Sequence, residues 1–337
     1  MPKAGKQTWV FSSQPRIVSA GTVAGKTESE GPLGGFFDIQ HLDDRINFDT
    51  WEHAEQTLFN EAANLAMSKA NLTPDQIDLM VGGDLNAQLS SFYFGLRTFP
   101  IPALGVYSAC ASFSAAMTVA ALAVDSQMAS YALAGTSSHN STAERQFRYP
   151  TEYGSQKPPT AQRTVTGSGM TVIGATGGSI AITHATVGQV EDFGIKSPWE
   201  MNAAMAPAAA ATIEAHLRDT GRSVEDYDCI ATGDLGYVGH DILHELLEAK
   251  NILPRTRLTD CGMLIYDRNQ PEVFSGGSGG ACATLVTLGY LFRQLETGKW
   301  KRLMVVATGA LLSGVTAQQH DTIPSVAHAV VFERKEG

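Results

Sequence analysis

The chain carries one sequence pattern twice, and this internal repeat constrains its fold more than any other feature. Residues 72–85 (LTPDQIDLMVGGDL) match residues 222–235 (RSVEDYDCIATGDL): an acidic helix start, a short apolar strand, then Gly-Asp-Leu. The stretch 106–138 matches 273–313, each running from a strand through a turn of small residues and an apolar helix to another strand. Because the matches occur in the same order, the sequence predicts two halves of one architecture.

Alternating apolar strands and helices predict a mostly parallel sheet in each half, covered by helices. The halves, residues 1–178 and 179–337, are expected to stack as a duplicated α/β fold of five layers, αβαβα. The apolar helices that follow Cys110 and Gly277 leave no polar face for water, so both should lie in the middle layer.

Charge and cysteine spacing exclude several classes of protein. The net charge of −10, from 34 acidic and 24 basic residues, argues against a nucleic-acid-binding surface. The four cysteines form no CxxC pair, so we expect no metal, no cofactor and no disulfide framework, but reduced thiols in an intracellular compartment. The N-terminus lacks the apolar core of a signal peptide, and the longest apolar run, residues 111–124, is too short for a transmembrane helix.

The turn before the first apolar helix holds a cysteine, in the run YSACASFSAAM (107–117). A thiol at a helix N-terminus feels the positive end of the helix dipole, which favours the thiolate. A cysteine in a helix rich in Ala and Ser is also explained as a small buried apolar side chain. The turn resembles the nucleophile turn of the thiolase superfamily, especially the ketoacyl synthases that start fatty-acid chains. This resemblance implies a thiolase-like fold and makes Cys110 the expected centre of a pocket.

The same resemblance implies two hydrogen-bond donors in the second half, which stabilise a thioester enolate during condensation. One is a His in the loop after the strand of residues 229–232, and the other is an Asn or His at the glycine turn before the second apolar helix. This sequence has Gly233 and Asp234 at the first place and Gly277 and Ser278 at the second, so neither donor is present. Asp234 matches Asp84 in the repeat, which favours a structural role as a helix cap or turn acceptor. Three histidines are candidates for replacement donors, although none matches in position: His139, His240 and His328.

A closer resemblance covers the chain from its start to residues 330–334. Residues 19–38 (SAGTVAGKTESEGPLGGFFD), 136–158 and 204–210 look like the stage V sporulation protein AD family, thiolase-fold proteins of endospore-forming bacteria. The resemblance implies binding of dipicolinic acid (pyridine-2,6-dicarboxylate) and a place at the periphery of the spore inner membrane. The implied partners are the other subunits of a complex that moves this acid during sporulation and releases it with calcium at germination. A homodimer is also expected from the thiolase-like fold.

Segment 139–163 is the most unusual stretch, because it gathers basic and aromatic residues in an acidic chain. A planar aromatic dianion needs guanidinium forks for its carboxylates and a flat face to stack on. Two other interpretations stay open: a dimer interface, where Tyr and Arg are also enriched, and surface ion pairs. The expected ligand site comprises Cys110, Ala111, Ser137, His139, Arg145, Arg148, Gly233, Asp234, Gly277 and Ser278.

Three functional hypotheses follow. The first is a non-catalytic dipicolinate-binding subunit. The second is an acyltransferase or condensing enzyme that uses Cys110 on an acyl thioester, and the third is a structural subunit with a vestigial pocket. The missing donors favour the first over the second, and the basic aromatic segment favours it over the third.

Overall fold

The structure, a computed structural model, describes residues 3–147, 157–253 and 255–335. Its strands form one long path in the order β12-β11-β14-β15-β10-β3-β9-β7-β5-β6. The first half contributes β3 (Arg16–Ala24), β5 (Leu79–Gly83), β6 (Ala103–Gly105), β7 (Tyr131–Ser138) and β9 (Gly167–Gly174). The second half contributes β10 (Ile180–Thr186), β11 (Cys229–Thr232), β12 (Leu258–Asp260), β14 (Arg302–Ala310) and β15 (Ser325–Arg334). The strand order within one half mirrors the order within the other, as the sequence repeat predicts.

The two halves of the sheet join over a short contact, in which β3 pairs with β10 through Ile17 and Ile180 and through Arg16 and Ala181. The boundary expected after residue 178 falls in the turn between β9 and β10. Short strands complete the sheets: β1 (Lys3–Ala4), β2 (Thr8–Val10) and β4 (Ile39–Gln40) at the margins, and β8 (Arg163–Thr164) paired with β13 (Gly277–Ser278) apart from them.

The expectation of a mostly parallel sheet in each half is correct: four of the five main strands described in each half run in one direction, and one strand, β9 or β15, is reversed. β5 runs parallel to β6 and β7, and β11 runs parallel to β12 and β14. In contrast, β9 is antiparallel to β7 and β3, and β15 is antiparallel to β14 and β10. Parallel neighbours need a long crossover, usually a helix, whereas antiparallel neighbours do not.

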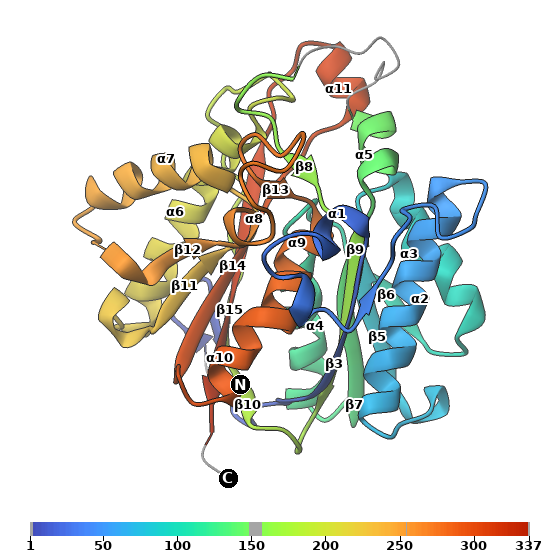
Figure 1. Cartoon of the computed structure of the whole chain (residues 1–337). Coiled ribbons are helices and arrows are strands. Elements are labelled where there is room, and N and C mark those ends of the chain that lie inside the picture. Colours follow the sequence, from blue (N-terminus) through green and yellow to red (C-terminus); the bar gives the residue numbers. More distant parts are fainter. Residues whose placement is uncertain (1–2, 148–156, 254, 336–337) are drawn as a thin grey trace.

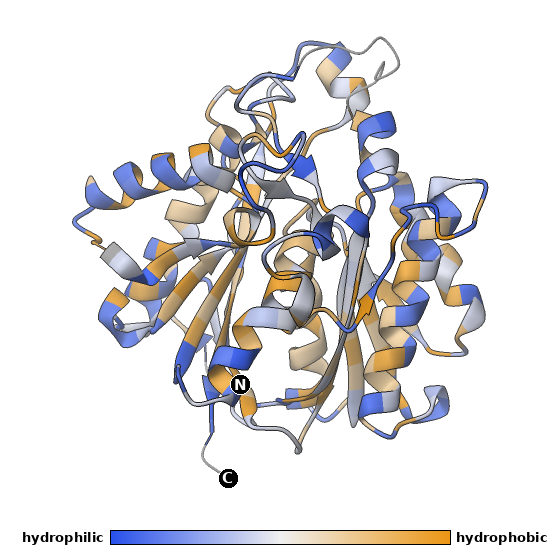
Figure 2. Ribbon diagram, in the orientation of Figure 1, coloured by the Kyte–Doolittle hydropathy of each residue, from blue (hydrophilic) through white to orange (hydrophobic). Residues whose placement is uncertain are grey.

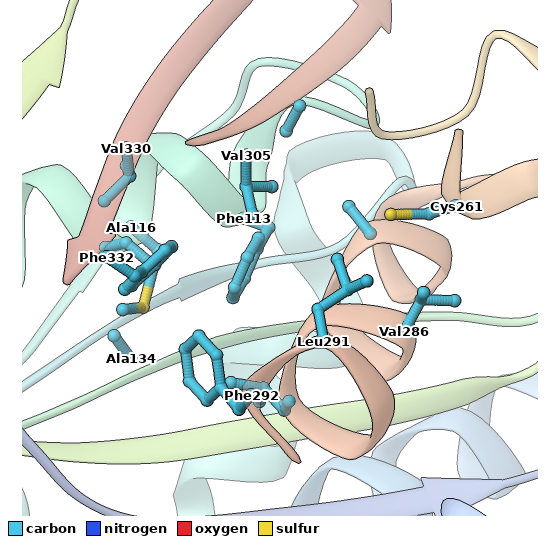
Figure 3. Close-up of a cluster of buried hydrophobic side chains, with 14 of the residues drawn as sticks. Phe113, Ala116, Ala134, Cys261, Val286, Leu291, Phe292, Val305, Val330 and Phe332 are labelled. Carbon is cyan, nitrogen blue, oxygen red and sulfur yellow. The ribbon is translucent and has the colours of Figure 1, made fainter. Parts of the chain in front are cut away.

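Two apolar helices form the middle layer between the sheets, as expected (Figure 1). They are α4 (Ser112–Asp125) and α9 (Gly280–Leu285), the latter continuing through a π-helical turn (Val286–Leu291) into α10 (Phe292–Glu296). Figure 3 shows Phe113 of α4 facing side chains of both sheets and of the second helix. The rings of Phe292 and Phe332 meet edge to face with their centroids 4.9 Å apart. Apolar residues on all sides of these helices therefore bind the two halves into one core.

Outer helices cover the remaining faces of the sheets (Figure 1). The first half carries α2 (Trp51–Lys69) and α3 (Ser90–Gly95), and the second carries α6 (Met201–Thr220) and α7 (Gly236–Glu248). Shorter helices are α1 (Lys26–Ser29), α5 (Asn140–Phe147), α8 (Cys261–Leu264) and α11 (Gly314–Gln318). Figure 2 shows apolar colour on the strands and hydrophilic colour on the outer turns of these helices. Among the described residues, no helix is long and apolar enough to cross a bilayer.

Candidate functional site

Cys110 lies in the turn that leads into α4, at the centre of the molecule. Ala109 has a φ of 50°, in the left-handed region that side chains other than glycine rarely adopt. The turn satisfies much of its own backbone, because Ala111 N–H donates to the Ser108 oxygen at 3.0 Å and Ser112 N–H to the Ala109 oxygen at 3.1 Å. The Ser112 hydroxyl also accepts the Ser108 N–H at 2.9 Å. The N–H groups of Ala111 and Ser112 are therefore already donated within the turn and are not available to a ligand.

A narrow cavity opens beside the Cys110 thiol. Its described walls are mainly apolar and come from both halves; they include Leu85, Tyr107, Cys110, Phe147, Ser278 and Leu312. The cavity has a volume of only ≈ 30 Å³, which is room for one or two waters. No basic side chain is found among the described residues that line it.

The Cys110 thiol is buried and in contact with polar groups of the second half. Its Sγ lies 3.9 Å from Ser278 Oγ, and Ser278 Oγ donates to Asp234 Oδ2 at 3.0 Å. Burial, followed by the negative charge of Asp234, raises the pKa of the Cys110 thiol well above its usual value. The helix dipole favours the thiolate, whereas desolvation and the neighbouring carboxylate act in the opposite direction and favour the neutral thiol.

Asp234 lies where the thiolase resemblance implies a hydrogen-bond donor, and it instead accepts hydrogen bonds from the groups around it. Besides Ser278, it accepts the Gly279 N–H at 3.0 Å and the Thr308 hydroxyl at 2.7 Å. Burial raises the pKa of this carboxyl to about 6, while the hydrogen bonds from Thr308 and Gly279 act in the opposite direction. The protein's own carboxylate therefore takes up donors that an oxyanion would otherwise use.

The backbone of the turn before α9 requires glycine at two positions. Gly276 and Gly279 have φ values of 112° and 104°, in the region that favours glycine. Gln162 fixes this turn to the other loop, because its Nε2 donates to the Asp234 backbone oxygen at 2.6 Å and to the Gly277 oxygen at 3.1 Å. Gly233 sits beside β14, where an added Cβ would lie 3.0 Å from the Ala307 Cα. The second half thus builds its side of the site from closely packed loops.

Sequence reasoning missed Gln162 and Thr308 as members of the site. Thr308 lies near the carboxyl end of β14, next to β11, whose carboxyl end leads to Asp234. A polar residue at the end of a buried strand was the available signal, because carboxyl ends of neighbouring parallel strands meet at one edge. Gln162 gave no such signal, since it lies in an irregular segment.

The paired aspartates both have the structural role expected of them, as acceptors of backbone N–H groups in helix starts or turns. Asp84 accepts the Asn86 N–H at 2.6 Å and the Phe92 N–H at 2.7 Å. Its pKa is raised to about 8, first by burial and then by the neighbouring Glu55. Asp234 instead binds the loop before α9, and Asp260 accepts the N–H groups at the start of α7.

Ser137 and His139 face other networks. The Ser137 hydroxyl donates to Glu55 Oε1 at 3.0 Å. His139 is fully buried; its Nδ1 accepts the Ser141 N–H at 3.1 Å and its Nε2 lies 2.9 Å from the Asp44 oxygen. These contacts use both ring nitrogens of His139, so its role here is to hold the chain between β7 and α5.

Arg145 does not line the cavity beside Cys110. Ala143 and Phe147 of α5 line the cavity, and a residue two positions from each lies on the opposite side of a helix. Arg145 accordingly forms an ion pair with Glu52 at the start of α2, with 58% of its side chain exposed. This contact is the surface ion pair that the sequence left open. Arg148, the other expected arginine, lies outside the described residues.

Among the candidate histidines, His328 comes nearest to the cysteine turn. Its Nε2 lies 3.3 Å from Ser108 Oγ, and its Nδ1 accepts the Gly188 N–H at 3.1 Å. Burial lowers the pKa of His328 to about 4, so the ring is neutral at neutral pH and supplies no positive charge to the thiol. His240 lies on α7, with Nδ1 4.0 Å from Asp241 Oδ1.

The duplicated, five-layered fold with a cysteine turn at its centre defines the thiolase class. A 3-oxoacyl-[acyl-carrier-protein] synthase III from Aquifex aeolicus superposes with a TM-score of 0.60 at 14% identity, covering 95% of this chain and 99% of that one. A human mitochondrial 3-ketoacyl-CoA thiolase superposes with a TM-score of 0.58 at 13% identity, covering 96% and 99%. At such identities these structures share the fold with this chain.

Sequence comparison then gives the family. The family model described as stage V sporulation protein AD matches residues 5–333. A Bacillus subtilis (strain 168) protein named stage V sporulation protein AD is 51% identical over 337 residues, covering 100% of this chain and 99% of its own. The chain belongs to the stage V sporulation protein AD family.

Proposed function

We propose that this protein is a non-catalytic, dipicolinate-binding subunit of a complex at the spore inner membrane. In this role it takes part in moving dipicolinate during sporulation and germination. Membership of the stage V sporulation protein AD family supports a role in sporulation. The resemblance of the sequence to that family supports dipicolinate as the ligand. The site chemistry supports the absence of condensation.

The position of Asp234 is the main observation that supports a protein without condensation activity. Condensation needs donors aimed at an oxygen that becomes negative in the transition state. Here the Asp234 carboxylate already accepts Ser278 Oγ and Gly279 N–H, each at 3.0 Å. A negative charge at this place opposes an enolate and also keeps the Cys110 thiol protonated.

The ligand's carboxylates require cations that the described cavity walls do not supply. In segment 139–163 the described cations lie against glutamates: Arg145 against Glu52, Lys157 against Glu144 at 3.5 Å, and Arg163 against Glu272 at 3.6 Å. A dicarboxylate would bind by taking the place of such a glutamate. Binding should therefore weaken as salt concentration rises.

Titration calorimetry of the full chain tests the ligand. We expect heat on binding dipicolinate and much less with isophthalate, which lacks the ring nitrogen. Arg145→Ala and Arg148→Ala should each weaken binding about tenfold, the effect of one lost charge-assisted contact, and Arg97→Ala on α3 is the matched control. Absence of binding by the unaltered protein would remove dipicolinate as the ligand.

Incubation with acyl-coenzyme A and a malonyl thioester tests the competing enzyme hypothesis. The expected result is no condensation product and no acyl adduct on Cys110 by mass spectrometry, because the thiol is protonated and its donors are occupied. Turnover that disappears in Cys110→Ala would show that the protein is an enzyme.

We also propose a homodimer, formed through the edge of the first sheet. β6 ends the strand order, and an exposed apolar surface lies beside it: Tyr93, Phe94, Leu104 and Tyr107 are 46%, 54%, 52% and 46% exposed. The Tyr93 hydroxyl accepts the Gly105 N–H at 3.0 Å, so α3 and β6 form one continuous face. An apolar sheet edge of this kind is suited to antiparallel pairing with a second copy.

A further inference from the structure

A polar hollow lies at the end of the molecule far from the apolar Cys110 cavity. Strand β7 separates the two places: at its last residue, the Ser138 hydroxyl accepts the Ala281 N–H beside the glycine turn. At its first residue, Tyr131 pairs with Gly174, which pairs in turn with Arg16. This far end is the lower end in Figure 1, where β10 starts and β15 finishes.

The hollow has a volume of ≈ 450 Å³ and a polar lining. It is formed by the turn of residues 175–179 between the two halves, together with Ser13, Arg16 and Lys335. Lys335 N–H donates to the Ser179 oxygen at 2.7 Å, which holds the last described residue of the chain against this turn.

Two glycines give the turn its shape. Gly177 and Gly178 have φ values of 96° and 67°, which other residues rarely adopt. A Cβ on Gly178 would lie 1.9 Å from the Ile17 oxygen, so this position admits no side chain. Within the described part of the chain, the N–H groups of Thr176, Gly177 and Gly178 donate no hydrogen bond. They remain available as donors in an exposed turn.

The cations around the hollow are weakly neutralised. Arg16 makes no ion pair within the described residues, and Lys335 Nζ lies 3.6 Å from Glu333 Oε2. Glu333 is already shared with Arg222 at 3.2 Å and Arg302 at 3.0 Å. The nearby Asp125 carboxylate accepts the N–H and hydroxyl of Ser13, at 2.6 and 2.7 Å. The lining therefore offers positive charge although the whole chain carries −10.

The same end gathers further exposed cations on neighbouring strands. Arg334 N–H donates to the Lys301 oxygen at 2.9 Å, so the end of β15 lies beside the start of β14. Lys299, Lys301 and Arg334 are exposed there, and none has an ion pair within the described residues. The Asp228 carboxylate lies among them and accepts the N–H groups of Lys301 and Arg302 at 2.7 and 2.9 Å. The side chains of Lys299, Lys301 and Arg334 thus add to the charge of the hollow without being paired to a carboxylate in the described part of the chain.

We infer that this hollow binds a phosphate group. A guanidinium, an ammonium and free backbone N–H groups are the donors that phosphate oxygens prefer. The phosphate belongs either to the headgroup of an anionic lipid or to a small soluble molecule. Such a site is independent of the dipicolinate proposal, because it lies at the other end of β7.

Sedimentation with phosphatidylglycerol vesicles and calorimetry with inorganic phosphate test the inference on the full chain. The double variant Arg16→Ser, Lys335→Ser should lose affinity for both probes by about tenfold or more. Lys26→Ser, an exposed cation on α1, is the matched control and should bind like the unaltered protein. The variant Arg16→Lys, which keeps the charge, should retain most of the affinity.

The two probes separate the sources of the phosphate. Binding to phosphatidylglycerol vesicles but not to phosphatidylcholine vesicles, with competition by inorganic phosphate, assigns the hollow to a lipid headgroup. Binding of inorganic phosphate without vesicle binding assigns it to a soluble phosphate. If neither probe binds, or if the double variant binds both as the unaltered protein does, the inference is wrong. Unchanged unfolding of the double variant confirms that a loss reflects the site.

Discussion

At the scale of single residues, buried carboxylates dominate the electrostatics of this protein. Glu28, Asp84 and Asp234 are each at most 1% exposed, and burial raises the pKa of each, to about 7, 8 and 6. Each is held by hydrogen-bond donors that lower the pKa by less than burial raises it. A carboxyl that gains a proton on folding makes stability depend on pH.

Glu28→Gln tests this dependence at one residue. Glu28 accepts the Thr166 N–H at 3.0 Å and the Tyr266 hydroxyl. Its pKa is raised from 4.5 to about 7, so the folded state binds more protons than the unfolded state in this range. Its contribution to the free energy of unfolding is complete below pH 4.5 and is lost as pH rises to about 7.

Urea unfolding at the two ends of this range measures the effect. The unaltered protein should lose more stability than Glu28→Gln on going from low to neutral pH, by about 1 kcal/mol or more per pH unit. The comparison uses the difference between the two proteins, because His184 and His216, with pKa values lowered to about 4 and 3, act with the opposite sign. Equal slopes for both proteins would contradict the raised pKa.

At the scale of elements, the sequence repeat was sufficient to predict the layers. A helix without a polar face must be buried on all sides, so the two apolar helices were expected between the sheets. The repeat was not sufficient for the direction of β9 and β15, since these strands are as apolar as the parallel strands beside them. Strand direction depends on the connection that leads into each strand, and the apolar pattern of a strand does not reveal that connection.

The candidate site was predictable in position but only partly in chemistry. Cys110, Asp234 and Ser278 do meet between the halves, as their places in the repeat indicate. The neutral thiol agrees with the interpretation of Cys110 as a buried apolar side chain, whereas the effect of Asp234 on its pKa was not predictable, because this carboxylate is far away in sequence. The direction of Arg145 depends on α5, and no helix was predicted in segment 139–163.

At the scale of the whole molecule, the two halves share one middle layer, and the edge of the first sheet is left apolar and exposed. Leu104→Lys places a charge at the centre of this edge and should weaken self-association strongly, because a buried unpaired charge is costly. Leu42→Lys is the matched control, since Leu42 is 83% exposed away from β6.

Light scattering over a range of protein concentrations measures this effect. The unaltered protein and Leu42→Lys are expected to be dimers, while Leu104→Lys shifts toward the monomer. A monomeric unaltered protein, or a dimeric Leu104→Lys, would show that the β6 edge is not the interface.

The central claim is that this thiolase fold holds its cysteine as a neutral thiol, and the ionisation of Cys110 tests it most directly. The far-ultraviolet absorbance of the thiolate, taken as the difference between the unaltered protein and Cys110→Ser, follows ionisation without requiring a reagent to enter the cavity. We predict no thiolate at neutral pH and a transition above the usual value of 9.0, shifted downward in Asp234→Asn because a negative charge is removed. A Cys110 thiolate already present at neutral pH would contradict the account and restore the case for an enzyme.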